Sequence, residues 1–182
     1  MTTDEAVAII AGVKQSGLNE LDLSNCIFNE VLWEELRLVG SKITNLTLAN
    51  CGIGTENAKL VADYCPNLQY LAIGNEPRNY SLVEWGKLSP DSINHIGNEG
   101  AIAIAGKLKK LTYLDISYNS VGVPGLTAIA SELTLLETLI VCPHSDIGIG
   151  TEGISSGCPN LRKIAVRLPY NILEEPGIFA KP

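Results

Sequence analysis

The sequence predicts an α/β solenoid in which short parallel strands alternate with helices. Two observations predict it. A pattern of apolar residues recurs in copies that begin at residues 18, 43, 68, 111, 136 and 161, so four steps are 25 residues long and one is 43. The centre of each copy also alternates apolar and variable positions, which is typical of a strand. We therefore expect about six repeats, with a parallel sheet on the concave side and helices on the convex side.

Each repeat begins with the strand pattern. The first copy reads Leu18-x-x-Leu21-x-Leu23-x-x-Cys26-x-Phe28. One strand and one helix bury too little apolar surface to be stable alone, so neighbouring repeats have to stack and share a core. The later copies begin at Ile43, Leu68, Leu111, Leu136 and Leu161.

Helix signals precede several of these strands. Residues Asp4 to Lys14 read as a helix, and Thr55 and Asn98 are each followed by a glutamate, so we expect both to act as helix N-caps. Pro124 lies near the start of the next helix, where its missing N–H is tolerated. The segments between strands are therefore predicted to be helical.

Two short motifs indicate a family. Cys65-Pro66-Asn67-Leu68 and Cys158-Pro159-Asn160-Leu161 lie at the start of two copies, and Asn98-Glu99-Gly100-Ala101 lies at a helix start. With the repeats, they resemble the leucine-rich repeat superfamily, in its cysteine-containing or ribonuclease-inhibitor-like subtype, from about residue 4 to about residue 170. The resemblance implies an intracellular scaffold for protein interactions. It also implies a buried polar ladder at Cys26, Cys51, Asn119 and His144.

Composition disfavours several partners. The net charge is -7 and the pI is about 4.8, which argues against nucleic acid and anionic lipid as ligands. The N-terminal residues include acids, and no apolar run approaches the roughly 20 residues that span a bilayer. Five cysteines without a close CxxC pair are typical of reduced thiols. We therefore expect a cytoplasmic protein that is monomeric alone.

Some motifs imitate catalytic sites. The glycines of 148–153 match a dinucleotide-binding loop, but residues 51–56 repeat the loop without its third glycine, so both read as parts of the repeat. Cys142 and His144 suggest a thiol nucleophile with its base, yet such a base comes from a different element. Cys26 and Cys51 supply two thiols where a structural zinc site needs four ligands. No catalytic, cofactor or metal site is predicted.

The outward positions of the strands form the candidate binding surface. Tyrosine and arginine are favoured at interface hot spots, and Tyr70 and Tyr113 occupy the same outward position in neighbouring repeats. Tyrosines also pack well on a sheet face without binding anything. The predicted partner-binding residues are Tyr70, Tyr113, Asp115, Tyr118, Tyr80, Trp85, Lys163 and Arg167.

The 43-residue step carries an insert near 76–92 within a single domain of residues 1–182. Tyr80 or Trp85 could form a wall beside the tyrosines. Alternatively, Leu82, Val83 and Trp85 could form a small helix that mends a break in the ladder at Glu76. The leading function is a scaffold that binds a protein on its concave face and insert. The alternatives are self-associating assembly and, last, a thiol enzyme.

Overall fold

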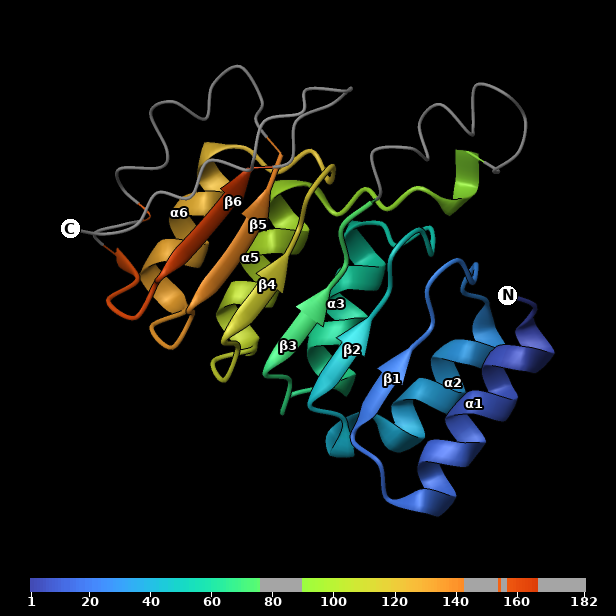
Figure 1. The fold of residues 1–182 in the computed structure, drawn as a ribbon. Helices are drawn as coiled ribbons and strands as arrows, with labels where there is room; N and C mark the ends of the chain where they lie inside the picture. Colours follow the sequence, from blue (N-terminus) through green and yellow to red (C-terminus); the bar gives the residue numbers. More distant parts are fainter. Residues whose placement is uncertain (76–89, 143–153, 155–156, 167–182) are drawn as a thin grey trace.

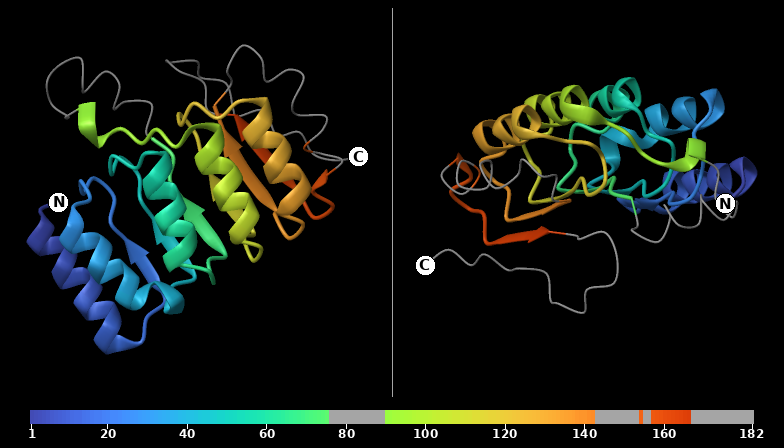
Figure 2. Two further views of the ribbon diagram at one scale, coloured as in Figure 1. Left: turned by 180° about the vertical axis from the view of Figure 1, so that it is seen from behind. Right: turned by 90° about the horizontal axis from the view of Figure 1, so that it is seen from above.

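The computed structural model describes residues 1–75, 90–142, 154 and 157–166. Within these residues, one layer of helices lies against one face of a parallel sheet (Figures 1 and 2). The view from above shows the helices on the outside of a bend and the strands on its inside (Figure 2). The elements are α1 (Thr3–Ser16), β1 (Glu20–Asp22), α2 (Glu30–Val39), η1 (Gly40–Lys42), β2 (Asn45–Thr47), α3 (Thr55–Tyr64), β3 (Tyr70–Ala72), η2 (Pro90–Ser92), α5 (Gly97–Lys107), β4 (Tyr113–Asp115), α6 (Val123–Glu132), β5 (Thr138–Val141) and β6 (Lys163–Val166).

The sheet confirms the predicted repeat. Its six strands lie in chain order from β1 to β6, and every neighbouring pair is parallel. The register is one residue to one residue, so each repeat stacks directly on the previous one. The central apolar positions line up as Leu21, Leu46, Leu71, Leu114, Leu139 and Ile164, all buried.

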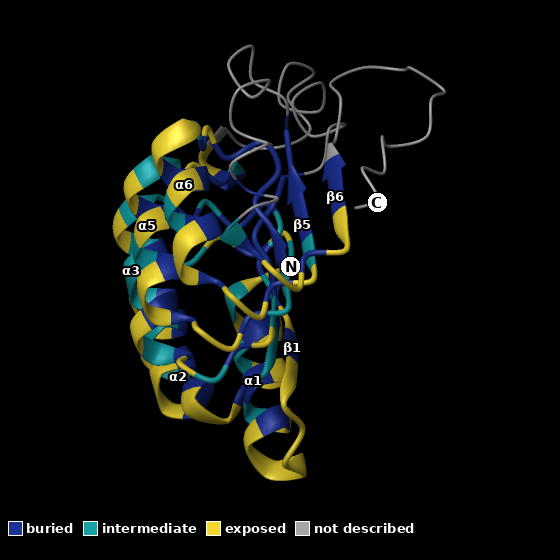
Figure 3. Ribbon diagram, turned by 90° about the vertical axis from the view of Figure 1, so that its left-hand side faces the viewer, coloured by how far each residue is buried: buried dark blue, intermediate teal, exposed yellow. Residues whose placement is uncertain are grey.

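The core lies between the sheet and the helices and is built from aliphatic side chains. Figure 3 shows buried residues along the inner sides of the helices and exposed residues along their outer sides. On α2, for example, Leu32, Leu36 and Val39 face inward at helical spacing and are buried. The helices are therefore held in place by this shared apolar face.

Two predicted helix caps act on a neighbouring repeat instead. The N-cap of α3 is Gly54, and Thr55 donates its hydroxyl hydrogen bond to Ile96 O at 2.9 Å. Asn98 lies inside the first turn of α5, where its Oδ1 accepts from Gly122 N and Gly125 N at the start of α6. The expectation that each residue caps its own helix was wrong, because stacking brings backbone groups of the next repeat within reach: a carbonyl for Thr55 and two N–H groups for Asn98.

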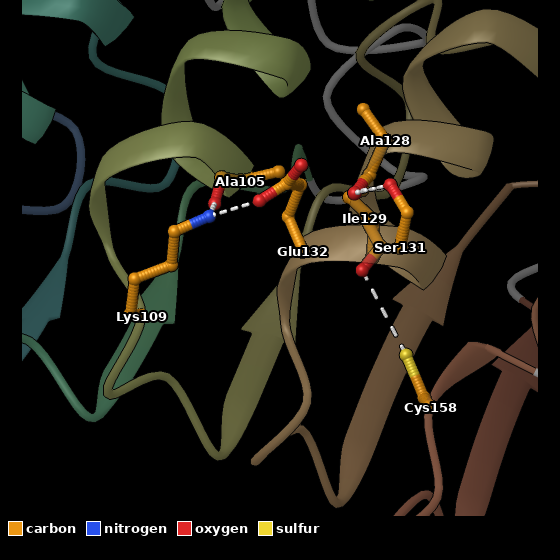
Figure 4. Close-up of polar contacts among 7 residues, drawn as sticks. All are labelled: Ala105, Lys109, Ala128, Ile129, Ser131, Glu132 and Cys158. Atoms are coloured by element: carbon orange, nitrogen blue, oxygen red, sulfur yellow. Dashed lines mark hydrogen bonds and ion pairs between the residues drawn. The ribbon is translucent and has the colours of Figure 1, made fainter.

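The helix layer is also joined by small residues and by lysine–carboxylate pairs. A Cβ on Gly100 of α5 would lie 3.1 Å from the Cβ of Ala58 in α3, so the glycine allows the two helices to approach closely. Lys109 donates to Ala105 O at the end of α5 and pairs with Glu132 at the end of α6 (Figure 4). The approach of Gly100 to Ala58 and the Lys109–Glu132 pair both connect adjacent repeats.

A buried polar ladder runs along the exits of the strands, as the family resemblance implies. Cys51 Sγ donates to Leu23 O at 3.0 Å in the preceding repeat. Asn119 Nδ2 donates to Ile73 O at 2.8 Å, again in the preceding repeat, and its Oδ1 accepts from Ile96 N. Such side chains satisfy backbone groups that would otherwise be buried without partners.

The ladder residue of the third repeat is Asn94. Its Nδ2 donates to Leu48 O at 2.7 Å and to Ile73 O at 2.8 Å. Its Oδ1 accepts from Cys51 N at 3.0 Å and from Ile53 N at 2.8 Å. Asn94 is fully buried, so one amide serves four backbone groups away from water.

Asn75, the last described residue before 76–89, contacts Asn94 directly. Asn94 N donates to Asn75 Oδ1, and Asn75 Nδ2 donates to Asn94 O and to Tyr118 O, each at 2.8 Å. Asn94, 19 residues after Asn75, takes the ladder position at which the sequence predicts a break at Glu76. The ladder is therefore continuous at this repeat. Residues 76–89, including Tyr80, Leu82, Val83 and Trp85, lie outside the described residues.

We expect Asn94→Ala to lower the free energy of unfolding by about 3–5 kcal/mol, because it leaves two buried N–H donors and two carbonyl groups without this partner. Urea denaturation followed by circular dichroism measures the change. Asn160→Ala is the matched control, since Asn160 makes an exposed hydrogen bond to Thr134 O. It should cost under about 1 kcal/mol. Equal losses in the two variants would contradict the central role of Asn94.

The cysteines belong to the core. All five lie in the described part of the chain, all are buried, and none is in a disulfide. Cys65 ends α3, and Cys158 Sγ donates to Ile129 O (Figure 4), so both thiols lie inside the core. Burial raises the pKa of Cys51 and of Cys65 to about 12 from an ordinary value of 9.0.

These raised pKa values predict a loss of stability in base. Above about pH 9 the unfolded thiols release protons while the folded ones keep them, so the stability declines as the pH rises towards 12. Each thiol contributes a slope of about 1.4 kcal/mol per pH unit at most. The Cys51→Ala/Cys65→Ala variant should therefore show a shallower decline between about pH 9.5 and 11, measured by urea denaturation under reductant. Parallel curves for variant and wild type would contradict this origin.

Candidate functional site

The candidate site is the sheet face opposite the helices. Strand register aligns one outward residue from each repeat into a row across this face. The two ends of the row are exposed and its centre is half-buried. In order from β1 to β6 the row reads Glu20, Asn45, Tyr70, Tyr113, Thr138 and Lys163.

Two predicted residues meet at the centre of this row. The rings of Tyr70 and Tyr113 stack with their centroids 4.1 Å apart and their planes 12° apart. The 43-residue step separates them in sequence, but β3 and β4 are hydrogen-bonded neighbours. The stack holds both rings in place, so they are pre-organised before any partner arrives.

Asp115 and Tyr118 differ from the sequence expectation. They were predicted among exposed binding residues, yet they are only 4% and 8% exposed. Asp115 Oδ1 accepts from Ser117 N at 2.9 Å and from Ser117 Oγ at 2.6 Å. This bonded pair occupies the space above Gly74, where a Cβ would overlap Asp115 Oδ1 and lie 2.5 Å from Ser117 Oγ. The Asp115 side chain therefore packs over Gly74, just after the neighbouring strand β3, and does not project into solvent.

The other predicted residues divide into two groups. Lys163 is exposed at the β6 end of the row, as expected. Tyr80, Trp85 and Arg167 lie outside the described residues.

An open groove lies over the first three strands. Asn45 and Tyr70 line it, and so do residues at the start of the repeat array. The predicted binding residues did not include these N-terminal positions, because they centred on the tyrosines, the insert and the basic C-terminal end. Acidic outward positions at β1 were the signal that could have indicated them. The lining residues are Leu18, Glu20, Leu21, Asp22, Asn45, Thr47 and Tyr70.

Hydrogen bonds fix the groove's two carboxylates. Asn45 Nδ2 donates to Glu20 Oε1 at 3.0 Å. Asp22 Oδ1 accepts from Ser24 N at 2.9 Å and from Ser24 Oγ at 2.6 Å, the same arrangement that Asp115 makes with Ser117. Glu20 and Asp22 are exposed, so this end of the face is wet, acidic and accessible.

The catalytic alternative gains little from the structure. Cys142 is 9% exposed, and burial raises the pKa of its thiol, which disfavours the thiolate that a nucleophile requires. His144 and the glycines of 148–153 lie outside the described residues. Among the residues that the structure describes, no group of three or more His, Cys, Asp or Glu side chains could hold a metal ion. Nor does any described helix have the length and apolar character to cross a membrane.

Comparison with known protein families links part of the chain to one of them. A family model described as a leucine-rich repeat matches residues 92–105 and 107–130. The first matched segment contains Asn94, and the second contains β4 with its ladder residue Asn119. None of the curated proteins matches the chain. The six parallel strands in one register, with helices on one face, have the architecture of a leucine-rich repeat solenoid, and the family match falls on the segment around β4.

Proposed function

We propose that the protein is an interaction scaffold that binds a partner protein on the concave face of its sheet. Leucine-rich repeat domains generally mediate protein–protein interactions. The observation that carries the proposal is the half-buried Tyr70–Tyr113 stack, because Tyr70 also lines the open groove.

Two features of the stack favour binding. Tyrosine buries a large ring with few rotatable bonds and carries a hydroxyl group that can form hydrogen bonds. The rings already stack on each other, so binding a partner would cost little side-chain entropy. A rigid aromatic centre with polar surroundings is the usual composition of an interface hot spot.

The insert belongs to the proposed surface. It leaves the sheet directly after Asn75, three residues beyond the end of β3, and Asn75 Nδ2 bonds Tyr118 O in the next repeat. This junction lies at the exits of β3 and β4, the two strands that carry the tyrosine stack. On that ground we place Tyr80 and Trp85 among the partner-binding residues.

We also propose a repeat subtype and a cellular location for the protein. Buried Cys65 and Cys158 precede the Pro-Asn-Leu turns of two repeats, which supports the cysteine-containing or ribonuclease-inhibitor-like subtype. Five buried thiols without a disulfide support a cytoplasmic protein. The net charge of -7 disfavours nucleic acid as a partner. We expect the protein to be a monomer in the absence of its partner.

A second function has one observation in its favour. The row across the sheet begins with acidic Glu20 on β1 and ends with basic Lys163 on β6. These opposite charges at the two edges would suit end-to-end assembly of identical copies. A salt-independent monomer in light scattering would exclude it.

The proposed face can be tested by photo-crosslinking. A benzophenone side chain at Thr47, in the groove, should crosslink a partner from lysate, whereas one at exposed Glu34 on α2 should not. Mass spectrometry identifies the crosslinked protein. Crosslinking from Glu34 alone would move the interface to the helices.

The tyrosine stack can be tested with the same partner. Tyr70→Ala and Tyr113→Ala should each weaken binding by about 2 kcal/mol or more, roughly 30-fold. The loss of stacking should lower folding stability by only about 1 kcal/mol. Tyr64→Ala, a partly buried tyrosine at the end of α3, is the matched control and should leave binding unchanged. Unchanged binding in both stack variants would refute the site.

A further inference from the structure

The groove's two carboxylates keep binding capacity for a ligand. Glu20 uses Oε1 for Asn45, and Asp22 uses Oδ1 for Ser24. Among the described residues, nothing donates to Glu20 Oε2 or Asp22 Oδ2. Each carboxylate is therefore held by one oxygen and keeps the other for a donor.

The acidic charge of the groove is also not neutralised within the described structure. The five ion pairs among the described residues join residues of the helices and of the loops that follow them. None of these pairs includes Glu20 or Asp22. A donor that supplies positive charge would therefore gain both a charge-assisted hydrogen bond and Coulomb attraction. The pairs are Arg37–Glu34, Lys59–Glu56, Lys59–Glu99, Lys107–Asp63 and Lys109–Glu132.

An apolar residue lies beside these charges. Leu18 is 60% exposed and lines the groove. The residues at the same repeat position are buried in every later repeat: Ile43, Leu68, Leu111, Leu136 and Leu161. Leu18 thus leaves an apolar surface in solvent on which the aliphatic stem of a lysine or arginine can pack.

The groove also contains an aromatic ring. Tyr70 lines it from β3, across Asn45 from Glu20. Arginine is the side chain that best combines bidentate bonding to carboxylates with packing on aromatic rings. Carboxylate, ring and exposed aliphatic surface therefore all favour the same kind of ligand.

The spacing of the carboxylates indicates the shape of that ligand. Glu20 and Asp22 are two residues apart on β1, so they point to the same face of the sheet, about 7 Å apart along the strand. Alternate side chains of an extended peptide have the same separation. An extended segment with basic residues at positions i and i+2 could therefore meet both carboxylates at once.

We propose that the groove over β1–β3 binds an extended, arginine-containing segment of the partner protein, with basic side chains on Glu20 and Asp22 and beside Leu18 and Tyr70. This rests on the proposed function, since it names the partner chemistry of the same concave face. The net charge of -7 would also speed the approach of such a cationic segment.

Fluorescence anisotropy tests the proposal with a fluorescein-labelled octapeptide of alternating arginine and serine. The matched probe replaces each arginine by citrulline, which keeps the shape and removes the charge. The wild-type protein should bind the arginine peptide at least about tenfold more tightly than the citrulline peptide.

Two variants separate local recognition from net charge. Glu20→Gln/Asp22→Asn removes the groove charges, and Glu34→Gln/Glu56→Gln removes the same number of charges from the exposed faces of α2 and α3. The groove variant should lose at least about tenfold in affinity, and the helix variant less than about twofold. Equal losses, equal binding of the two peptides, or no binding of the arginine peptide would overturn the proposal.

The remaining outcomes distinguish this inference from the broader function. If the Thr47 crosslink to a partner persists in Glu20→Gln/Asp22→Asn with unchanged affinity, the concave face binds proteins by other chemistry and only the cationic proposal fails. No crosslink from Thr47 overturns both. If wild-type protein alone self-associates in sedimentation and the groove variant does not, a second copy occupies the groove, which also overturns the cationic segment.

Discussion

The fold depends on satisfying backbone hydrogen bonds at the strand exits, repeat after repeat. The strands are only three or four residues long, so many backbone carbonyl and N–H groups next to them point into the core and have no partner in the sheet. Cys51, Asn94 and Asn119 supply the missing partners from inside. Because each bonds a neighbouring repeat, the ladder also fixes the register on which every side-chain row depends.

The same stacking decides where a ligand can approach. In the outward row that contains Asp22, the residues of β1 and β2 remain at least partly exposed, while Ala72, Asp115, Ile140 and Ala165 are buried. In this row the accessible part is therefore the N-terminal half, where the groove lies. The tyrosine stack sits at the border between the two halves, which places a rigid aromatic surface next to a wet, acidic one.

Repetition also explains why motif-like sequences in this chain are structural. Thr55 and Asn98 look like ordinary helix caps, but they bond the next repeat. Cys26 and Cys51 could suggest a metal site, yet both lie in the core, and burial raises the pKa of both thiols. In another fold such side chains would cap a helix or bind a metal ion. In this solenoid they form hydrogen bonds between neighbouring repeats.

The sequence by itself determined the strand positions, the inward apolar residues and the alignment of Tyr70 with Tyr113, because a fixed repeat length with period-two alternation leaves one register that buries the central apolar residue of every strand. Counting 25 residues back from Asn119 could also have found Asn94. Tertiary structure alone decided that Asp115 and Tyr118 are buried, and that Leu18 stays exposed and lines a groove with Glu20 and Asp22. Those outcomes depend on which residues of neighbouring repeats pack over a side chain. Sequence periodicity alone does not give these packing contacts.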